Sequence, residues 1–252
     1  MARRRFFVEA VRGGRAELVG ETAEHLRRVL RAEPAQQFEI SDNHSVYLAE
    51  IDAVAKDLVS FRVLEEIEGQ ARPVRLVALV SLIKFDRFEW IVEKATELGV
   101  ETLVPVMAGR SEKGLDKAAL KRVERWRRIA VESSQQSRRD RLPEIATCIP
   151  FEEALQTQGQ HRYFLEEEPS APPLLTVLPK MKTCGDRVCL LAGPEGGWTS
   201  DERKASSASG WQPVSLGPQI LRTETAVIAA LAVLGSAWTQ EKGSPRLSRE
   251  EP

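Results

Sequence analysis

The sequence holds few of the residues that build covalent or metal-bound frameworks. Among its 252 residues are three cysteines, Cys148, Cys184 and Cys189, and three histidines. The cysteines are odd in number and have no C-x-x-C spacing, which argues against a disulfide framework and against a zinc site. We interpret all three as reduced thiols buried as small apolar side chains, and we expect no metal in the protein.

The chain also lacks a long apolar run. None approaches the ~20 residues that a membrane span needs, and the basic start of the chain is not followed by the apolar block of a secretory signal. We therefore expect a cytoplasmic protein that enters no membrane. Hydrophobic residues make up 42% of the chain and charged residues 29%, which is ordinary for a globular protein of one large domain or two smaller ones.

Positive charge is present but segregated, although the net charge is −1. Residues 1–31 contain eight arginines against four glutamates, and residues 110–141 contain eleven basic residues against five acidic ones. Between residues 32 and 72 the balance reverses, with nine acids against three bases. A solvated helix face explains many single charge runs. Two separate basic segments in a nearly neutral chain favour contacts with nucleic-acid phosphates instead.

Residues 1–72 are predicted to form a small β-rich domain. A helix is expected from Thr22 to Leu30. Short strand patterns occur at residues 6–8, 16–19, 38–40, 46–51 and 58–64. Several short strands at this spacing favour a small barrel over a sheet with crossover helices. The segment carries no converging catalytic residues, so binding is its better assignment.

From residue 73 to about 240 strands alternate with helices, which is typical of an α/β domain, and residues 241–252 are predicted to be disordered. Strands are predicted at residues 76–80, 102–107, 162–165, 187–192 and 214–216. Helices are predicted at residues 86–98, 116–137, 151–157, 199–209 and 226–238. Asp116 is the expected cap of the second helix, and a capping box that begins at Thr199 starts the fourth. The last helix is so apolar that it must be buried within the domain or against another subunit.

Two glycine-containing turns are the most informative stretches. They are Leu190-Leu-Ala-Gly-Pro-Glu-Gly-Gly-Trp198 and Leu216-Gly-Pro-Gln-Ile-Leu-Arg-Thr-Glu-Thr225. Each follows an apolar run and precedes a helix, which is where an α/β sheet binds its ligands. The first turn fits neither a dinucleotide fingerprint nor a phosphate-binding loop. The structural alternative is that Thr223 caps the last helix and that the positive end of the helix dipole stabilises Glu224. Capping gives no reason for Arg222 at this position.

The two turns resemble the paired C-terminal motifs of the RsmE family, which are SPOUT-class methyltransferases that act on uridine N3 of 16S ribosomal RNA. Further matches in the same order extend over most of the chain. They are His25-Leu-Arg-Arg-Val-Leu-Arg31, Lys84 with Glu93-Lys-Ala-Thr-Glu-Leu-Gly99, Gln136-Ser137 with Arg139, and Leu142-Pro-Glu-Ile145. Matches in this number and order are far more specific than a lone glycine pattern.

The resemblance implies an architecture and a set of partners. A PUA-like β-barrel at residues 1–72 would precede a SPOUT methyltransferase domain with a deep trefoil knot at residues 73–240. The family further implies a homodimer, S-adenosylmethionine as methyl donor, and 16S ribosomal RNA within the small subunit as substrate. The glycine turns become knot loops that cradle the cofactor. The residues expected to bind it are Leu191, Gly193, Gly196, Gly197, Leu216, Gly217, Ile220, Leu221 and Thr223.

Methylation of uridine N3 also requires removal of its imide proton. Arg222 is the candidate for stabilising the negative charge that spreads onto the uracil oxygens, since a guanidinium can donate two hydrogen bonds to them. Glu224 or Glu195 is the candidate base, directly or through water, and the sequence does not distinguish the two. Contacts to RNA are expected from Arg3, Arg5, Arg28, Arg31, Lys84, Arg138 and Arg139.

The sequence departs from the family pattern at several positions. Gln219 stands where the second motif usually has an arginine, which leaves room for a non-catalytic RNA-binding or assembly factor of the same fold. Asp42-Asn43 replaces an Asp-Gly turn, a mild change because Asn also tolerates positive φ. Gln135-Gln136 and Arg138-Arg139 replace a Glu-Gln and a Gly-Arg pair. The same chemistry on another RNA, such as tRNA, is a second alternative.

Overall fold

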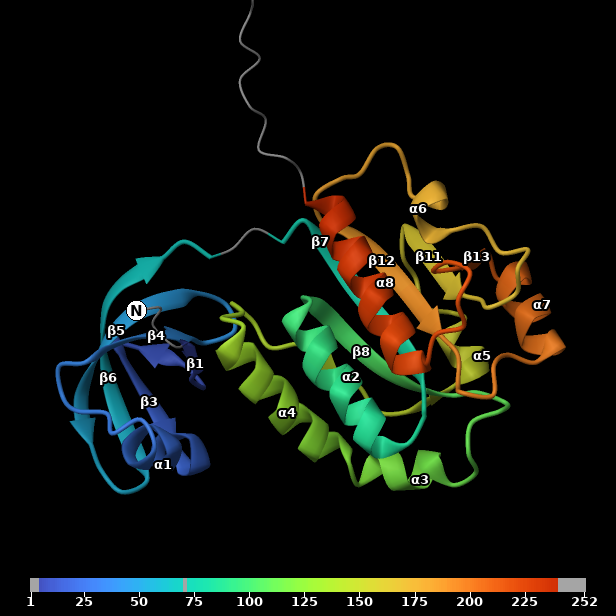
Figure 1. The fold of residues 1–252 in the computed structure, drawn as a ribbon. Helices are drawn as coiled ribbons and strands as arrows, with labels where there is room; N and C mark the ends of the chain where they lie inside the picture. Colours follow the sequence, from blue (N-terminus) through green and yellow to red (C-terminus); the bar gives the residue numbers. More distant parts are fainter. Residues whose placement is uncertain (1–4, 70–71, 240–252) are drawn as a thin grey trace, which may run out of the picture. The chain divides into compact units, whose positions relative to one another are not determined.

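The computed structural model describes residues 5–69 and 72–239 of the chain (Figure 1). The chain forms two compact units, one of residues 1–71 and 125–143 and the other of residues 72–124 and 144–252. The boundary after residue 71 lies beside the predicted one. The return of residues 125–143 to the first unit is not indicated by the sequence. The tail predicted to be disordered lies outside the described residues.

The first unit contains a six-stranded sheet that curls around one apolar core (Figure 1). Its strands are β1 (Arg5–Phe7), β2 (Val11–Arg12), β3 (Arg15–Val19), β4 (Gln37–Ser41), β5 (Val46–Val54) and β6 (Leu58–Ile67). They lie in the order β1-β4-β5-β6-β3-β2, antiparallel except for the parallel pair of β1 and β4. Helix α1 (Gly20–Arg28) places Leu26 in the core beside Phe6 and Phe61. The curled sheet agrees with the small barrel that the sequence predicts.

The turn between β4 and β5 explains why Asn43 is accepted at this position. Asn43 has a left-handed φ of 70°, which Asn tolerates better than most residues. Its side-chain oxygen also accepts a hydrogen bond of 2.9 Å from the N–H of Leu142, a contact that glycine could not make.

Burial acts to raise the pKa of Asp42, but hydrogen bonds from the N–H groups of Ser45 and His44 outweigh it and hold this pKa below its usual value.

Arg5 lies at the centre of a buried ion cluster in the first unit. Its guanidinium donates to Glu39 at 2.9 and 3.2 Å and pairs with Asp140. It also donates to the backbone oxygen of Arg138 at 2.7 Å, and the Arg138 guanidinium itself pairs with Glu39. Only 5% of the Arg5 side chain is exposed. These contacts hold residues 138–140 against β1 and β4, which is why that segment belongs to the first unit.

The second unit is built on a parallel sheet. Its strands are β7 (Val74–Ser81), β8 (Val100–Met107), β9 (Glu144–Ile145), β10 (Ile149–Pro150), β11 (His161–Leu165), β12 (Asp186–Ala192) and β13 (Gln212–Val214). They lie in the order β10-β8-β7-β12-β11-β13, with β9 paired to β8. Strands β7, β8 and β12 are buried along most of their length, as expected for parallel strands that are covered on both faces.

Helices cover the parallel sheet. They are α2 (Phe85–Glu97), α3 (Leu115–Leu120), α5 (Phe151–Ala154), α6 (Leu174–Val177), α7 (Ser200–Ala208) and α8 (Thr223–Trp238). A further helix, α4 (Val123–Gln136), belongs to the first unit from Arg125 onward. Helices α2 and α8 pack on each other over one face (Figure 1). On the other face Leu79 and Leu191 form a core with Phe151, Trp198 and Trp211.

The prediction of one long helix at residues 116–137 is wrong, because the chain forms two helices there, α3 and α4. Helix α3 begins after Gly114, which has a left-handed φ of 85°. Asp116 therefore lies in the first turn and is not the cap. The break falls between Leu120 and Val123. There the Arg122 guanidinium lies over the ring of Phe85 in α2, 5.2 Å from the ring centre. The spacing of apolar residues along the sequence could not predict this contact.

The cysteines are free, but they are not all buried as predicted. Cys189 is buried, Cys148 is partly exposed and Cys184 is exposed. Burial, together with the negative charge of Asp116, raises the pKa of Cys148 to about 11, and burial also raises the pKa of Cys189. Within residues 5–69 and 72–239 no group of His, Cys, Asp or Glu side chains could hold a metal ion. No helix in these ranges is both long and apolar enough to cross a membrane.

Replacing Arg5 with alanine should lower the free energy of unfolding by about 3–5 kcal/mol, because Glu39 and Asp140 lose a shared partner in a buried setting. Arg28→Ala is the matched control, since Arg28 forms an exposed pair with Glu24 one turn away and its loss should cost less than about 1 kcal/mol. Urea denaturation of both variants measures the difference. Equal stability of the two variants would show that the Arg5 cluster is not structural.

Candidate functional site

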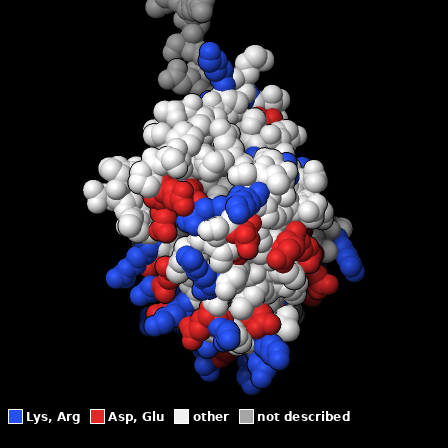
Figure 2. Space-filling view, turned by 90° about the vertical axis from the view of Figure 1, so that its right-hand side faces the viewer, with Lys and Arg blue, Asp and Glu red and all other residues white. Residues whose placement is uncertain are grey.

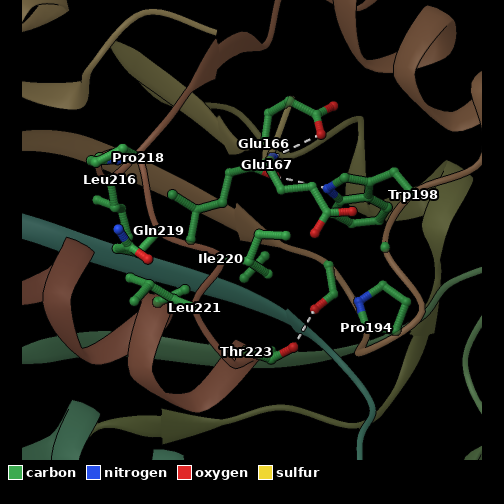
Figure 3. Close-up of a pocket in the computed structure, with 16 residues that line it drawn as sticks. Glu166, Glu167, Pro194, Trp198, Leu216, Pro218, Gln219, Ile220, Leu221 and Thr223 are labelled. Atoms are coloured by element: carbon green, nitrogen blue, oxygen red, sulfur yellow. Dashed lines mark hydrogen bonds between the residues drawn. The ribbon is translucent and has the colours of Figure 1, made fainter. Parts of the chain in front are cut away.

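Two loops at the carboxyl ends of parallel strands form the walls of one pocket (Figure 3). The first loop follows β12 and contains residues 193–199, and the second, residues 215–222, joins β13 to α8. The hydroxyl of Thr223 donates a hydrogen bond of 3.0 Å to the carbonyl of Gly193. The helix cap is Arg222, and Thr223 is the first residue of the helix. Thr223 therefore does not cap α8, which was the structural alternative, but ties the two loops together.

The pocket has room for a ligand of moderate size. The volume between its walls, open mouth included, is about 680 Å³, within the range of small-molecule sites. Seven of the predicted cofactor residues line it: Gly193, Gly197, Leu216, Gly217, Ile220, Leu221 and Thr223. Leu191 is instead buried in the core below. Gly196 faces away, and its carbonyl accepts a hydrogen bond of 2.9 Å from Arg110.

Trp198 forms a rigid wall of the pocket. Its ring is buried and stacks on Phe164 with ring centres 4.6 Å apart. Its indole N–H donates to the carbonyl of Leu165 at 2.8 Å. A Cβ atom at Gly193 would lie 2.9 Å from this ring, so only glycine lets the backbone pass so close to it. The sequence does not assign a pocket role to Leu165 or Trp198.

Glycine is favoured at position 197 by its backbone conformation, and an added side chain would also displace the end of Glu167. The φ of Gly197, 67°, is left-handed, a conformation that other residues rarely adopt. A Cβ atom there would also lie 2.7 Å from Oε1 of Glu167. Glu167 and its neighbour Glu166 line the pocket from the segment after β11. Neither glutamate is recognisable from the sequence as part of the site, because this segment contains only a run of acids followed by prolines.

Helix α7 fixes the far end of the first loop. The predicted capping box is confirmed: the hydroxyl of Thr199 accepts from the N–H of Glu202 at 3.1 Å, and the Glu202 carboxylate accepts from the N–H of Thr199 at 2.8 Å. Arg203, the next residue, donates to Glu166 at 2.6 and 3.1 Å and to the carbonyl of Trp198 at 2.8 Å. The loop is thus held at both ends.

Glu195 and Glu224, the two candidate bases, share one arginine that the sequence does not single out. Arg87, near the start of α2, pairs with Glu195, and its Nε lies 3.9 Å from Oε1 of Glu224. The Glu224 side chain is 4% exposed, against 41% for Glu195. Oε2 of Glu224 has no hydrogen-bond partner among the described residues. A buried acceptor left unpaired is costly and marks a group held ready for another partner.

Arg222 is exposed at the start of α8. Within the part of the chain that the structure describes, its guanidinium forms no ion pair. It directly precedes Thr223, which lines the pocket, and lies two residues before Glu224. Its position is therefore compatible with contact to a second ligand at the pocket.

The arginines and lysine expected to bind RNA differ in their availability. Arg3 lies outside the described residues. The prediction that Arg5 contacts a phosphate is wrong, because its guanidinium is buried between two carboxylates. The Arg138 guanidinium pairs with Glu39. Arg28, Arg31 and Lys84 are exposed, while Arg139 is partly exposed. Lys84 immediately precedes α2, one turn before Arg87. The face seen in Figure 2 shows basic side chains mixed with acidic ones and no continuous basic patch.

Known proteins match both the sequence and the fold. A family model described as an RNA methyltransferase domain matches residues 70–235. The ribosomal RNA small subunit methyltransferase E of Bacillus subtilis (strain 168) is 32% identical over 247 residues, which cover 91% of this chain and 95% of that protein. The chain belongs to the ribosomal RNA small subunit methyltransferase E family, RsmE. The resemblance found in the two glycine turns is thus confirmed.

Two solved structures are similar over nearly the whole RsmE chain. The Neisseria gonorrhoeae ribosomal RNA small subunit methyltransferase E bound to S-adenosylmethionine is 27% identical, with a TM-score of 0.84, and the match covers 94% of this chain and 98% of that one. A methyltransferase from Legionella pneumophila, also with S-adenosylmethionine, is 28% identical with a TM-score of 0.85 and the same coverage. They confirm the α/β SPOUT fold. The trefoil knot stays a prediction, because the order of strands in a sheet does not show whether the chain passes through one of its own loops.

Gly197→Ala should destabilise the protein more than Gly217→Ala. Both glycines have positive φ, so each substitution should cost about 1–3 kcal/mol in strain. Only Gly197 has a side-chain atom in the path of the new methyl group, from Glu167. In a Glu167→Ala background the extra cost of Gly197→Ala should disappear, and urea denaturation of the four variants measures it. An extra cost that persists without the Glu167 carboxylate would contradict this packing.

Proposed function

We propose that this RsmE protein transfers the methyl group of S-adenosylmethionine to N3 of a uridine in 16S ribosomal RNA of the small subunit. One observation supports the proposal most: the pocket walled by glycine loops lies beside the cluster of Arg87, Glu195 and Glu224. Pro194 and Thr223 line the pocket, and the next residue in each case is one of the two glutamates. A small-molecule site and a proton-accepting site thus share the same two loops.

The residues of the pocket fit S-adenosylmethionine. Gly193 and Gly197 bring bare backbone to the pocket where any Cβ atom would collide, and Leu216, Ile220 and Leu221 offer apolar contacts to an adenine ring. When bound, the cofactor supplies a methyl group activated by a positively charged sulfur. The chain itself positions the reacting groups and removes the proton of uridine N3.

Glu224 is the better candidate for the base. Its carboxylate is buried and has an unpartnered oxygen, whereas Glu195 is more exposed and is engaged by Arg87. A base needs a lone pair without a partner, which Oε2 of Glu224 has among the described residues. Arg87 then acts as a positioning residue that holds both carboxylates. Arg222 forms no ion pair with any other described residue and is assigned to the uracil oxygens, where negative charge develops.

RNA binding is assigned to exposed basic residues. Arg28 and Arg31 on the first unit are available to phosphates, as is Lys84 on the second. The first unit, with no catalytic cluster of its own, is proposed to bind RNA. Contacts of this kind depend on counterion release and therefore weaken as the salt concentration rises.

A homodimer is proposed from the outer face of α8. The helix has no charged residue after Glu224, yet one side of it is exposed or only partly buried. This side carries Thr225, Ile228, Ala229, Ala232, Val233 and Ser236. Small and apolar side chains at helical spacing suit close packing against a second copy of the same chain.

Glu224→Gln should reduce methyl transfer by about 100-fold or more, since a positioned general base contributes this much. Glu195→Gln is the matched variant and should cost less than about tenfold. The assay measures transfer from labelled S-adenosylmethionine to small subunits from cells that lack the protein. Calorimetry with S-adenosylmethionine should show that both variants still bind the cofactor. A larger loss in Glu195→Gln than in Glu224→Gln would reverse the assignment.

Ala232→Glu should convert the dimer to a monomer by placing a charge in the middle of the proposed interface. Thr239→Glu is the control, because Thr239 is exposed just beyond the end of α8. Light scattering after size exclusion measures the mass of each protein. If the wild-type protein is a monomer, or Ala232→Glu stays dimeric, this face is not the interface.

The two alternative functions have distinct outcomes in these assays. A non-catalytic RNA-binding factor need not bind S-adenosylmethionine, so absence of a calorimetric signal with the wild-type protein would support it. A methyltransferase for tRNA would bind the cofactor but would methylate tRNA in place of small subunits.

A further inference from the structure

The pocket has an unbalanced charge. Its lining includes two carboxylates, Glu166 and Glu167, and no Lys, Arg or His side chain. Glu166 is neutralised locally, because Arg203 donates two hydrogen bonds to it. The Glu167 carboxylate forms no hydrogen bond or ion pair with any residue in the described ranges. The Arg203 guanidinium attracts the Glu167 carboxylate electrostatically but donates no hydrogen bond to it. The negative charge of the pocket is therefore only partly compensated.

The backbone at Glu167 is held by its surroundings. Its N–H donates to a carboxylate oxygen of Glu166 at 2.8 Å, and the preceding Leu165 is held through its carbonyl by the indole of Trp198. With Glu166 held by Arg203, the Glu167 side chain extends toward the pocket below Trp198 (Figure 3). There its Oε1 occupies the space over Gly197 that a Cβ atom would need. Glu167 is thus an exposed residue whose side chain lines the pocket.

We propose that Glu167 makes the pocket prefer the charged methyl donor over its neutral product. This inference rests on the proposed function. In the reaction the bond between the methyl carbon and sulfur breaks and its electron pair stays on sulfur. The methyl carbon bonds to uridine N3, and the N3 proton passes to the base. S-adenosylmethionine, with a sulfonium, an ammonium and a carboxylate, carries a net positive charge, whereas S-adenosylhomocysteine carries none.

A carboxylate that is only partly compensated at the pocket attracts the first compound more than the second. Glu167 is exposed to solvent on one side, so water screens the attraction and the expected preference is modest, about threefold to tenfold in the dissociation constant. The preference lowers competition by the product after each turnover. It also lets methyl transfer itself weaken the binding of the spent cofactor.

The test is calorimetric titration of the full chain with three compounds. They are S-adenosylmethionine, S-adenosylhomocysteine, and sinefungin, an analogue with an amine in place of the sulfonium. Sinefungin keeps the positive charge without a transferable methyl group, so it separates charge from reactivity. The proteins are the wild type, Glu167→Gln and the control Glu168→Gln. Glu168 is an exposed neighbour that lies 3.3 Å from Arg203 and does not line the pocket.

Glu167→Gln should weaken both cationic compounds by about threefold to tenfold and S-adenosylhomocysteine by less than about twofold. Glu168→Gln should leave all three dissociation constants within about twofold of the wild type. If Glu167→Gln weakened the binding of all three compounds equally, the proposal would be overturned, because Glu167 would then contact a group that all three compounds share. No change in any of them would overturn it as well. If the wild-type protein bound none of the compounds, the proposed function itself would fail.

Discussion

The site depends on the hydrogen bond between the Thr223 hydroxyl and the Gly193 carbonyl. It joins the loop after β12 to the start of α8, two segments 30 residues apart in the chain. Both loops begin at the carboxyl ends of parallel strands, but neither is bound to its neighbour by a strand ladder. The bond between them fixes the width of the pocket. It also brings together the segments that carry Glu195 and Glu224, whose carboxylates Arg87 joins further.

Close approach of backbone and side chains makes the pocket possible and limits its sequence. Gly193 admits the Trp198 ring and Gly197 admits the Glu167 carboxylate. The same loop is held by the Thr199–Glu202 capping box and by Arg203. The first loop is therefore held at both ends before any ligand binds, which reduces the ordering entropy that binding costs.

The local features of the fold could be predicted from the sequence. Strand and helix periods located most elements, the capping box at Thr199 was recognisable, and the two glycine turns indicated the site and the family. Contacts between distant segments could not be predicted in this way. The basic residues at the start of the chain indicated phosphate contacts, yet Arg5 is paired with Glu39 and Asp140. Arg87 and Glu167 join the site only because the fold brings α2 and the segment after β11 to the glycine loops.

The central claim is that this chain methylates N3 of a uridine in small-subunit ribosomal RNA. N3 methylation blocks Watson–Crick pairing, so mass spectrometry and reverse-transcription stops can map it in the RNA of cells with and without the gene. Deleting the gene should remove one N3-methyluridine from 16S ribosomal RNA, and restoring the gene should return it. An unchanged set of N3-methyluridines in the deleted strain would contradict it.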